Sequence, residues 1–252
     1  MSQYKLLLYI LIFIYGIVIG SFLNVCIFRI PKKESIVTVG SHCMNCGKKI
    51  KWYDLVPLFS FLILRGRCRN CKVKLSVQYP VIEGLNGVLY LVVFAVNGFS
   101  VESVLYCLLV SVLLVLSVID YRTLEIPLAL NITILVIGVV HLCVDFDNYL
   151  DYIIGFFAVS LFLLLCYVIT KGRGIGGGDI KLMAAAGLCV GWKNIIFALF
   201  AGCLIGSVVQ CVKMAVTKEG RMFAFGPYLS LGIFLSILFG NRFFSWYLGL
   251  IR

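Results

Sequence analysis

The sequence predicts an all-α polytopic integral membrane protein with about eight transmembrane helices and a small zinc-ribbon-like cytoplasmic loop. Three observations lead to this fold class. The 252 residues are 62% hydrophobic and only 13% charged, whereas soluble domains carry about a quarter charged residues. The apolar residues form long continuous runs, and the basic residues gather in one polar stretch. This composition excludes a water-soluble enzyme, a disordered chain and a large soluble domain on a membrane anchor.

Eight apolar runs approach or reach the roughly 20 residues that a helix needs to cross a bilayer. They cover residues 4–28, 81–96, 101–119, 128–144, 152–170, 180–190, 195–216 and 225–250. The sixth run is short, and Gly240-Asn241-Arg242 interrupts the eighth. Strands of an outer-membrane barrel alternate apolar and polar residues, so continuous runs exclude that class. The first run lacks a small-x-small cleavage site, which argues against a cleaved signal peptide.

Charge sets the expected orientation of these spans. The loop at 29–80 has a net charge of +9, from eleven basic and two acidic residues. The positive-inside rule places this loop in the cytoplasm and the N-terminus outside. Alternation then puts the acidic stretch 145–151 outside and these basic residues inside: Arg122, Lys171, Arg173, Lys181, Lys218 and Arg221. Membrane topology therefore explains the basic loop, with anionic membrane lipids as its partner, and no nucleic-acid binding is expected.

Four cysteines in this loop form two CxxC pairs, Cys43 with Cys46 and Cys68 with Cys71, separated by 21 residues. Two such pairs can present four thiolates tetrahedrally to zinc, and a closed four-thiolate site is structural. Bound metal would also let a short polar loop fold without a core of its own. A redox or disulfide role is the alternative. The other seven cysteines lie singly in apolar runs and are interpreted as small hydrophobic residues.

Two aspartates at the edges of predicted spans are candidates for function, because carboxylates at this depth are costly to keep. Asp120 ends the third span and Asp179 opens the sixth, and the topology places both at the cytoplasmic face. Two close carboxylates can share one proton, so that the ionised group activates water while the protonated group donates to a carbonyl oxygen. This pattern predicts aspartic-protease chemistry. A helix-capping role for Asp179 is the alternative.

The residues before Asp179 are Gly176, Gly177 and Gly178, and Lys181 follows it. Glycine suits a backbone that approaches another chain closely or adopts a positive φ angle. We therefore assign these four residues to a loop that contacts an extended peptide substrate. A flexible hinge and an ordinary interfacial lysine are the alternatives.

The motifs taken together resemble those of the type IV prepilin peptidases, bacterial membrane aspartic peptidases with a GxGD signature. Residues 176–182 match the family's GGGDxKL, and Asp120 followed by Ile126-Pro127 matches the element around its first catalytic aspartate. Further matching segments are 20–25, parts of 57–68, 79–83 and 225–228. Two residues depart from the family pattern: Met44 replaces the usual proline of the first CxxC, and Gln78 replaces the usual arginine before Tyr79.

The resemblance implies a protein of the bacterial inner membrane that cuts the basic leader of type IV prepilins and pseudopilins after a glycine. It assigns the catalytic role to Asp120 and Asp179. Members with a large cysteine-bearing first loop usually also N-methylate the new terminus with S-adenosylmethionine. On this interpretation residues 1–80 belong to the methyltransferase function and residues 81–252 to the peptidase. Asn24 and Glu83 are candidates for the methyl-donor site, and helix packing explains them equally well.

Two other functions remain open from the sequence. The first is a peptidase without methylation, in which the cysteine loop is purely structural. The second is a cation-coupled transporter that uses the carboxylates and the glycine-interrupted helix as an ion site. The aspartates lie at the edge of their spans and no inverted repeat is visible, and both observations count against the transporter.

Overall fold

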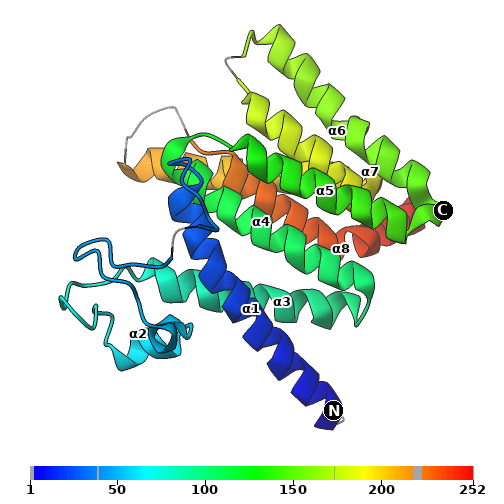
Figure 1. Ribbon diagram of the computed structural model, residues 1–252. Coiled ribbons are helices and arrows are strands. Elements are labelled where there is room, and N and C mark those ends of the chain that lie inside the picture. Colours follow the sequence, from blue (N-terminus) through cyan, green and yellow to red (C-terminus); the bar gives the residue numbers. More distant parts are fainter. Residues whose placement is uncertain (1–2, 39, 173, 218–222, 252) are drawn as a thin grey trace. The chain divides into compact units, whose positions relative to one another are not determined.

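The computed structural model describes residues 3–38, 40–172, 174–217 and 223–251, which form helices joined by turns and loops without a strand among them (Figure 1). The elements are α1 (Gln3–Arg29), η1 (Trp52–Leu55), α2 (Phe59–Ile63), α3 (Gln78–Asn97), α4 (Val101–Thr123), α5 (Leu128–Val144), η2 (Phe146–Asn148), α6 (Tyr149–Ile169), α7 (Gly177–Thr217) and α8 (Gly226–Ile251), where η marks a 3₁₀ helix. The all-α prediction is confirmed. Three basic residues used above for orientation, Arg173, Lys218 and Arg221, lie outside the described residues.

Six helices in the described part of the chain are long and apolar enough to cross a membrane: α1, α3, α4, α6, α7 and α8. The apolar α5 is shorter, at 17 residues, and has the bounds that the sequence predicts. Gly191 interrupts α7 with a φ of 79°, so this 41-residue element consists of two helices. The sixth and seventh predicted runs are those two helices. Gly240 does not break α8, which continues to Ile251.

The chain divides into two compact units, Met1–Ala95 and Val96–Arg252. In the first unit, α1 and α3 touch through their backbones. A Cβ on Gly16 would lie 2.7 Å from Cα of Gly87, and a Cβ on Gly20 would lie 2.7 Å from Cα of Glu83. The order of these contacts makes the two helices antiparallel, and small residues allow their close approach. The loop between α1 and α3 therefore begins and ends at the same end of the helix pair.

In the second unit, glycine contacts determine the course of α7 and α8. A Cβ on Gly202 would lie 3.0 Å from the carbonyl oxygen of Tyr228, near the start of α8. Asn194, just after the reversal in α7, contacts Gly240 near the other end of α8. The second half of α7 therefore runs antiparallel to α8 and returns toward the end at which α7 began, as Figure 1 shows.

Three helix ends meet at that end of the second unit. The backbone N–H of Gly226, at the start of α8, donates to Asp120 in the last turn of α4. Gly178, at the start of α7, packs against Ile126 in the turn that follows α4. We call this end of the second unit the aspartate end. Asp120 and Asp179, which lie at the ends of apolar runs in the sequence, are both found there.

Candidate active site and metal centre

Asp120 lies in the last turn of α4 and is 5% exposed. Its Oδ2 accepts a hydrogen bond from the N–H of Gly226 at 2.9 Å. Gly226 opens α8, so this N–H has no acceptor within its own helix. The positive end of the α8 dipole also favours a carboxylate at this position. The contact therefore supplies a buried carboxylate with one of the partners that it needs.

Asp179 lies in the first turn of α7 and is 8% exposed. Its Oδ2 accepts a hydrogen bond from the N–H of Gly176 at 3.3 Å. This arrangement resembles one half of a capping box, in which an acidic side chain reaches back to a donor before the helix. The capping role considered from the sequence is therefore present. It engages one oxygen of the carboxylate and does not prevent a second role.

Both aspartates line one cavity of about 670 Å³ at the aspartate end. The turn after α4, residues 124–126, and the glycine segment 174–178 form part of its wall. The remaining lining residues are apolar or sulfur-containing and come from α6, α7 and the segment before α8: Phe162, Leu163, Leu199, Cys203, Phe223, Ala224 and Phe225. A largely apolar cavity with a few convergent polar groups is the usual form of a ligand site.

The three glycines of the GGGD segment have different surroundings. A Cβ on Gly178 would lie 2.9 Å from Cβ of Ile126, and a Cβ on Gly176 would lie 3.0 Å from Oδ2 of Asp179. A Cβ on Gly177 would meet no atom within 4 Å. None of the three has a positive φ angle. Close approach of neighbouring atoms therefore explains Gly176 and Gly178, while Gly177 faces open space along the cavity wall.

Two further residues differ from the sequence picture of the site. Lys181 is exposed and is not among the residues that line the cavity. Asn131 of α5, which sequence reasoning missed, is 4% exposed, and its Nδ2 donates a long hydrogen bond of 3.5 Å to the carbonyl oxygen of Gly178. Its signal in the sequence is a lone amide inside an apolar run. We infer that Asn131 supports the glycine segment from the side of α5.

The first unit holds a separate cluster of four thiols. The sulfur atoms of Cys43, Cys46, Cys68 and Cys71 all lie within 4.8 Å of one another, and those of Cys43 and Cys71 are 3.8 Å apart. Four thiolates around zinc at about 2.3 Å form a tetrahedron whose edges are roughly 3.8 Å. Backbone N–H groups, principally of Lys48, Cys71 and Val73, lower the pKa of Cys46, Cys68 and Cys71 respectively. The cluster can therefore hold a metal ion.

The two CxxC segments have the same local geometry. In each segment, the N–H of the residue after the second cysteine donates a hydrogen bond to the carbonyl oxygen of the first cysteine. These bonds run from Gly47 to Cys43 and from Lys72 to Cys68. Both of these residues have a positive φ angle, 66° and 58°. The first segment therefore forms the same turn as the second, although Met44 stands where the family usually has a proline.

An asparagine in each CxxC segment contacts a cysteine of the other segment. Asn45 Nδ2 lies 3.6 Å from Sγ of Cys71, and Asn70 Nδ2 lies 3.7 Å from Sγ of Cys46. An N–H donor beside a thiolate stabilises its negative charge and orients it, as outer hydrogen bonds do in metal sites. Each contact therefore places an N–H donor beside a sulfur that could bind a metal ion, Cys71 in one case and Cys46 in the other.

Asn24 and Glu83 have structural contacts in the first unit. Asn24 is 1% exposed, and its Nδ2 donates to the carbonyl oxygen of Tyr79 at 3.2 Å, while Gln78 Nε2 donates to its Oδ1 at 3.3 Å. Glu83 is 6% exposed, and its Oε2 accepts from the N–H of Leu58 at 2.8 Å. Both residues tie α1, the loop and α3 together. Their role toward a methyl donor stays a prediction.

Comparison with known protein families identifies both parts of the chain. Residues 14–97 match the bacterial peptidase A24 N-terminal domain, and residues 107–211 match the type IV leader peptidase family. A prepilin leader peptidase/N-methyltransferase of Bacillus subtilis (strain 168) is 30% identical over 241 residues, which cover 94% of this chain and 97% of that protein. The chain belongs to the type IV leader peptidase family. The resemblance drawn from the motifs is confirmed.

Other relatives with the same name show the same pattern. The protein of Pectobacterium carotovorum subsp. carotovorum is 34% identical over 247 residues, covering 86% of this chain and 88% of that one. The protein of Myxococcus xanthus (strain DK1622) is 32% identical over 213 residues, and the match spans 82% of this chain but 64% of that relative. No solved structure matches the chain. Membership of a peptidase family argues against the cation-coupled transporter considered from the sequence.

The glycine contacts of this family member lead to a first prediction. Gly178→Ala should lower thermal stability, because its Cβ would overlap Ile126, and overpacking of this kind typically costs about 1–3 kcal/mol. Gly177→Ala is the matched control and should leave thermal stability unchanged, because its Cβ would meet open space. Thermal unfolding of the two variants in the same detergent measures the difference. Equal destabilisation by both substitutions would contradict the packing assigned to Gly178.

Proposed function

We propose that the chain is a membrane aspartic endopeptidase that removes the basic leader of type IV prepilins and pseudopilins, cutting after a glycine. We further propose that it then methylates the new N-terminal residue with S-adenosylmethionine. The observation that carries the peptidase proposal is the position of Asp120 and Asp179 on one largely apolar cavity. The names of the relatives supply the substrate class and the second activity.

In the proposed reaction the two carboxylates have complementary roles. One accepts a proton from the attacking water, and the other donates a proton to the carbonyl oxygen of the scissile amide. The N–H groups of Gly226 and Gly176 hold Oδ2 of each aspartate and so fix the orientation of both side chains. The apolar wall limits solvent at the reacting atoms, which strengthens electrostatic interactions there. No nucleophilic side chain is needed.

The substrate reaches this cavity from the side, within the bilayer. Phe162 of α6 and Cys203 of α7 line the cavity and are also exposed, so the cavity adjoins the outer surface of the second unit at these residues. An apolar helix of a prepilin can approach along this flank. Glu125 also lines the cavity and favours a basic leader, whereas the +9 loop of the first unit repels one.

For orientation we propose that the N-terminus lies outside and that residues 29–80 and the aspartate end lie on the cytoplasmic side of the bacterial inner membrane. Arg122 in the last turn of α4 and Lys171 just after α6 support this assignment. Basic residues at the ends of spans favour the cytoplasmic side. A prepilin leader, itself basic, is held on that side by the same rule.

Residues 1–80 are proposed to serve the methyltransferase activity and residues 81–252 the peptidase. Asn24 and Glu83 are the proposed candidates for the methyl-donor site, although their observed contacts are structural. The alternative is a peptidase that does not methylate. Mass spectrometry of the mature substrate distinguishes the two, because methylation adds the mass of one methyl group.

The peptidase assignment predicts that Asp120→Asn and Asp179→Asn each abolish leader cleavage, because each removes one half of the proton transfer. Both variants should insert into the membrane like the wild type. Cleavage of a prepilin by membranes that carry equal amounts of each variant measures the effect. Asp147→Asn is the control, since Asp147 is exposed in η2 at the opposite end of α5 and α6 and should not affect cleavage. Full cleavage by either active-site variant would overturn the assignment.

The metal of the first unit is proposed to be zinc, held by Cys43, Cys46, Cys68 and Cys71 in a structural role. The chemistry of the donor set supports this choice, because four thiolates in a tetrahedron suit zinc and leave no position for water or substrate. When bound, the metal would supply the folding energy that a short polar loop lacks.

Purified protein should therefore contain about one zinc per chain, as expected of a single closed site. Cys46→Ser should reduce this content, and Cys211→Ser should not, because Cys211 is an exposed cysteine of α7 outside the cluster. Elemental analysis of both variants and the wild type tests the site. A metal-free protein in which all four loop thiols react readily would count against it.

A further inference from the structure

A short segment of the first-unit loop, at Leu58, is attached to α3 about one and a half turns after the start of that helix. The N–H of Leu58, the residue before α2, donates to Glu83 Oε2 at 2.8 Å, and a Cβ on Gly84 would lie 4.0 Å from Cδ2 of Leu58. Leu58 is the centre of a tight turn (φ 59°, ψ −55°) in which the N–H of Phe59 bonds to the carbonyl oxygen of Pro57 at 2.6 Å. Such turns are strained and persist only where other contacts hold them.

The attachment determines the depth of α2 in the bilayer. Glu83 lies five residues after the start of α3 at Gln78, which is about 7.5 Å along the helix axis. The span formed by α3 has 20 residues and is about as long as the hydrocarbon core is thick. A residue bonded to Glu83 therefore lies beneath the headgroups, about 7.5 Å inside the edge of the hydrocarbon core, and not in the surrounding water.

The side chains that α2 presents at this depth are large and apolar. Phe59, Leu62 and Ile63 are 66%, 71% and 76% exposed, and Trp52 of the adjoining η1 is 80% exposed. A contiguous apolar surface of this kind is unfavourable in water and marks a contact surface. Tryptophan is moreover a residue that prefers the membrane interface.

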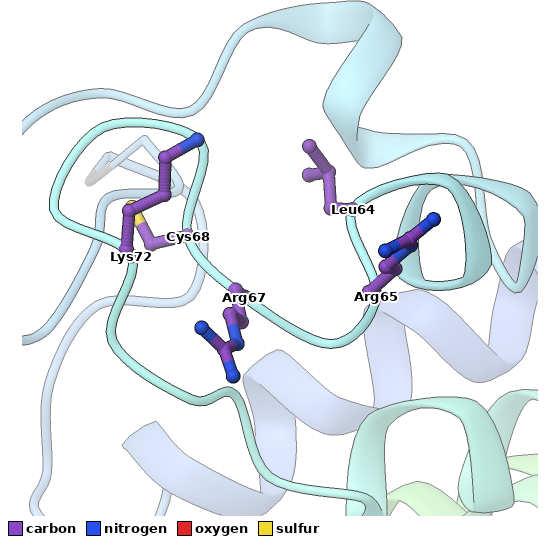
Figure 2. A pocket seen from close by; sticks show the side chains of 5 residues that line it. All are labelled: Leu64, Arg65, Arg67, Cys68 and Lys72. Atoms are coloured by element: carbon purple, nitrogen blue, oxygen red, sulfur yellow. The ribbon is translucent and has the colours of Figure 1, made fainter.

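A basic pocket of about 320 Å³ adjoins the end of α2. Leu64 and Arg65 line one side of it, directly after the helix, and Arg67, Cys68 and Lys72 line the other (Figure 2). The described lining residues thus include three cations and no carboxylate. This charge is complementary to a lipid phosphate, which arginine and lysine bind through charge-assisted hydrogen bonds.

We propose that this surface binds an anionic phospholipid of the leaflet on the side of the loop. The acyl chains lie against Phe59, Leu62 and Ile63, and the phosphate lies in the pocket of Arg65, Arg67 and Lys72. An apolar segment flanked by cations is the general form of an interfacial membrane anchor. The proposal depends on contacts within the first unit and does not rest on the peptidase assignment.

The anchor would also hold the cysteine cluster close to the membrane. Arg69, inside the second CxxC, donates to Asp54 of η1 from Nη2 at 2.7 Å and from Nε at 2.9 and 3.1 Å, and its guanidinium lies 5.3 Å from the ring centre of Tyr53. The pKa of Asp54 is held below its usual range by Arg69. The cysteine cluster is therefore joined by an ion pair between arginine and carboxylate to η1, which adjoins α2.

Tryptophan fluorescence of the full-length protein in lipid vesicles tests the depth of α2. In a background of Trp52→Phe, Trp192→Phe and Trp246→Phe, a single tryptophan is introduced by Leu62→Trp or, as the matched control, by Met44→Trp. Leu62 and Met44 are equally exposed in the structure, at 71% and 72%, but Met44 lies in the first CxxC. Lipids brominated in the upper acyl chain should quench the Leu62→Trp protein and blue-shift its emission, whereas aqueous acrylamide should quench the Met44→Trp protein.

Three results would overturn the proposal. Quenching of the Leu62→Trp protein by acrylamide as strong as that of the control would place α2 in water. Protection of Leu62→Trp from both quenchers would mean that protein covers this surface, either the second unit of the chain or a substrate helix. The third is equal quenching by brominated phosphatidylglycerol and brominated phosphatidylcholine, because the pocket predicts a preference for the anionic lipid.

The charge requirement has its own variant. Arg65→Gln combined with Lys72→Gln should remove the preference for brominated phosphatidylglycerol while leaving quenching by brominated phosphatidylcholine unchanged. Persistence of the anionic preference in this variant would show that the pocket is not the site of the phosphate.

Discussion

Direct contact between backbone and neighbouring atoms, at positions where no side chain would fit, determines the geometry at the aspartate end. Gly226 approaches Asp120 so closely that a Cβ would lie 2.7 Å from its Oδ2, and this approach delivers the N–H that binds the carboxylate. Gly178 in turn brings the start of α7 against Ile126. Each contact places a polar group at a helix end inside an apolar bundle. The first contact gives Asp120 its hydrogen-bond donor, and the second brings the start of α7, which carries Asp179, against the turn after α4.

The sequence predicts the helices well because membrane spans depend on a property that is local. Continuous apolar length is sufficient, and α5 begins and ends where its apolar run does. The sequence also indicates that Asp120 and Asp179 lie at the same depth, since alternation of spans follows from their count. The structure adds that both line one cavity, which required the arrangement of three helix ends and could not follow from spacing alone.

Other features of the site depend on tertiary contacts and leave little trace in one sequence. Gly176, Gly177 and Gly178 look alike in the motif, but only two of them are in close contact with other atoms. Asn131 is 47 residues from Gly178 in the chain and reaches it only through the packing of α5 beside α7. The extent of the first compact unit depends on contacts of the same kind, because α3 packs against α1 through glycines.

The central claim is that Asp120 and Asp179 act together on one peptide bond. Binding of a transition-state analogue tests it most directly: a prepilin junction peptide in which a hydroxyethylene group replaces the scissile amide. Such analogues bind at least about a hundredfold more tightly than substrates when the catalytic groups are in place. We expect tight binding by the wild type and loss of that advantage in both Asp120→Asn and Asp179→Asn. Wild-type affinity in either variant would contradict a shared catalytic site.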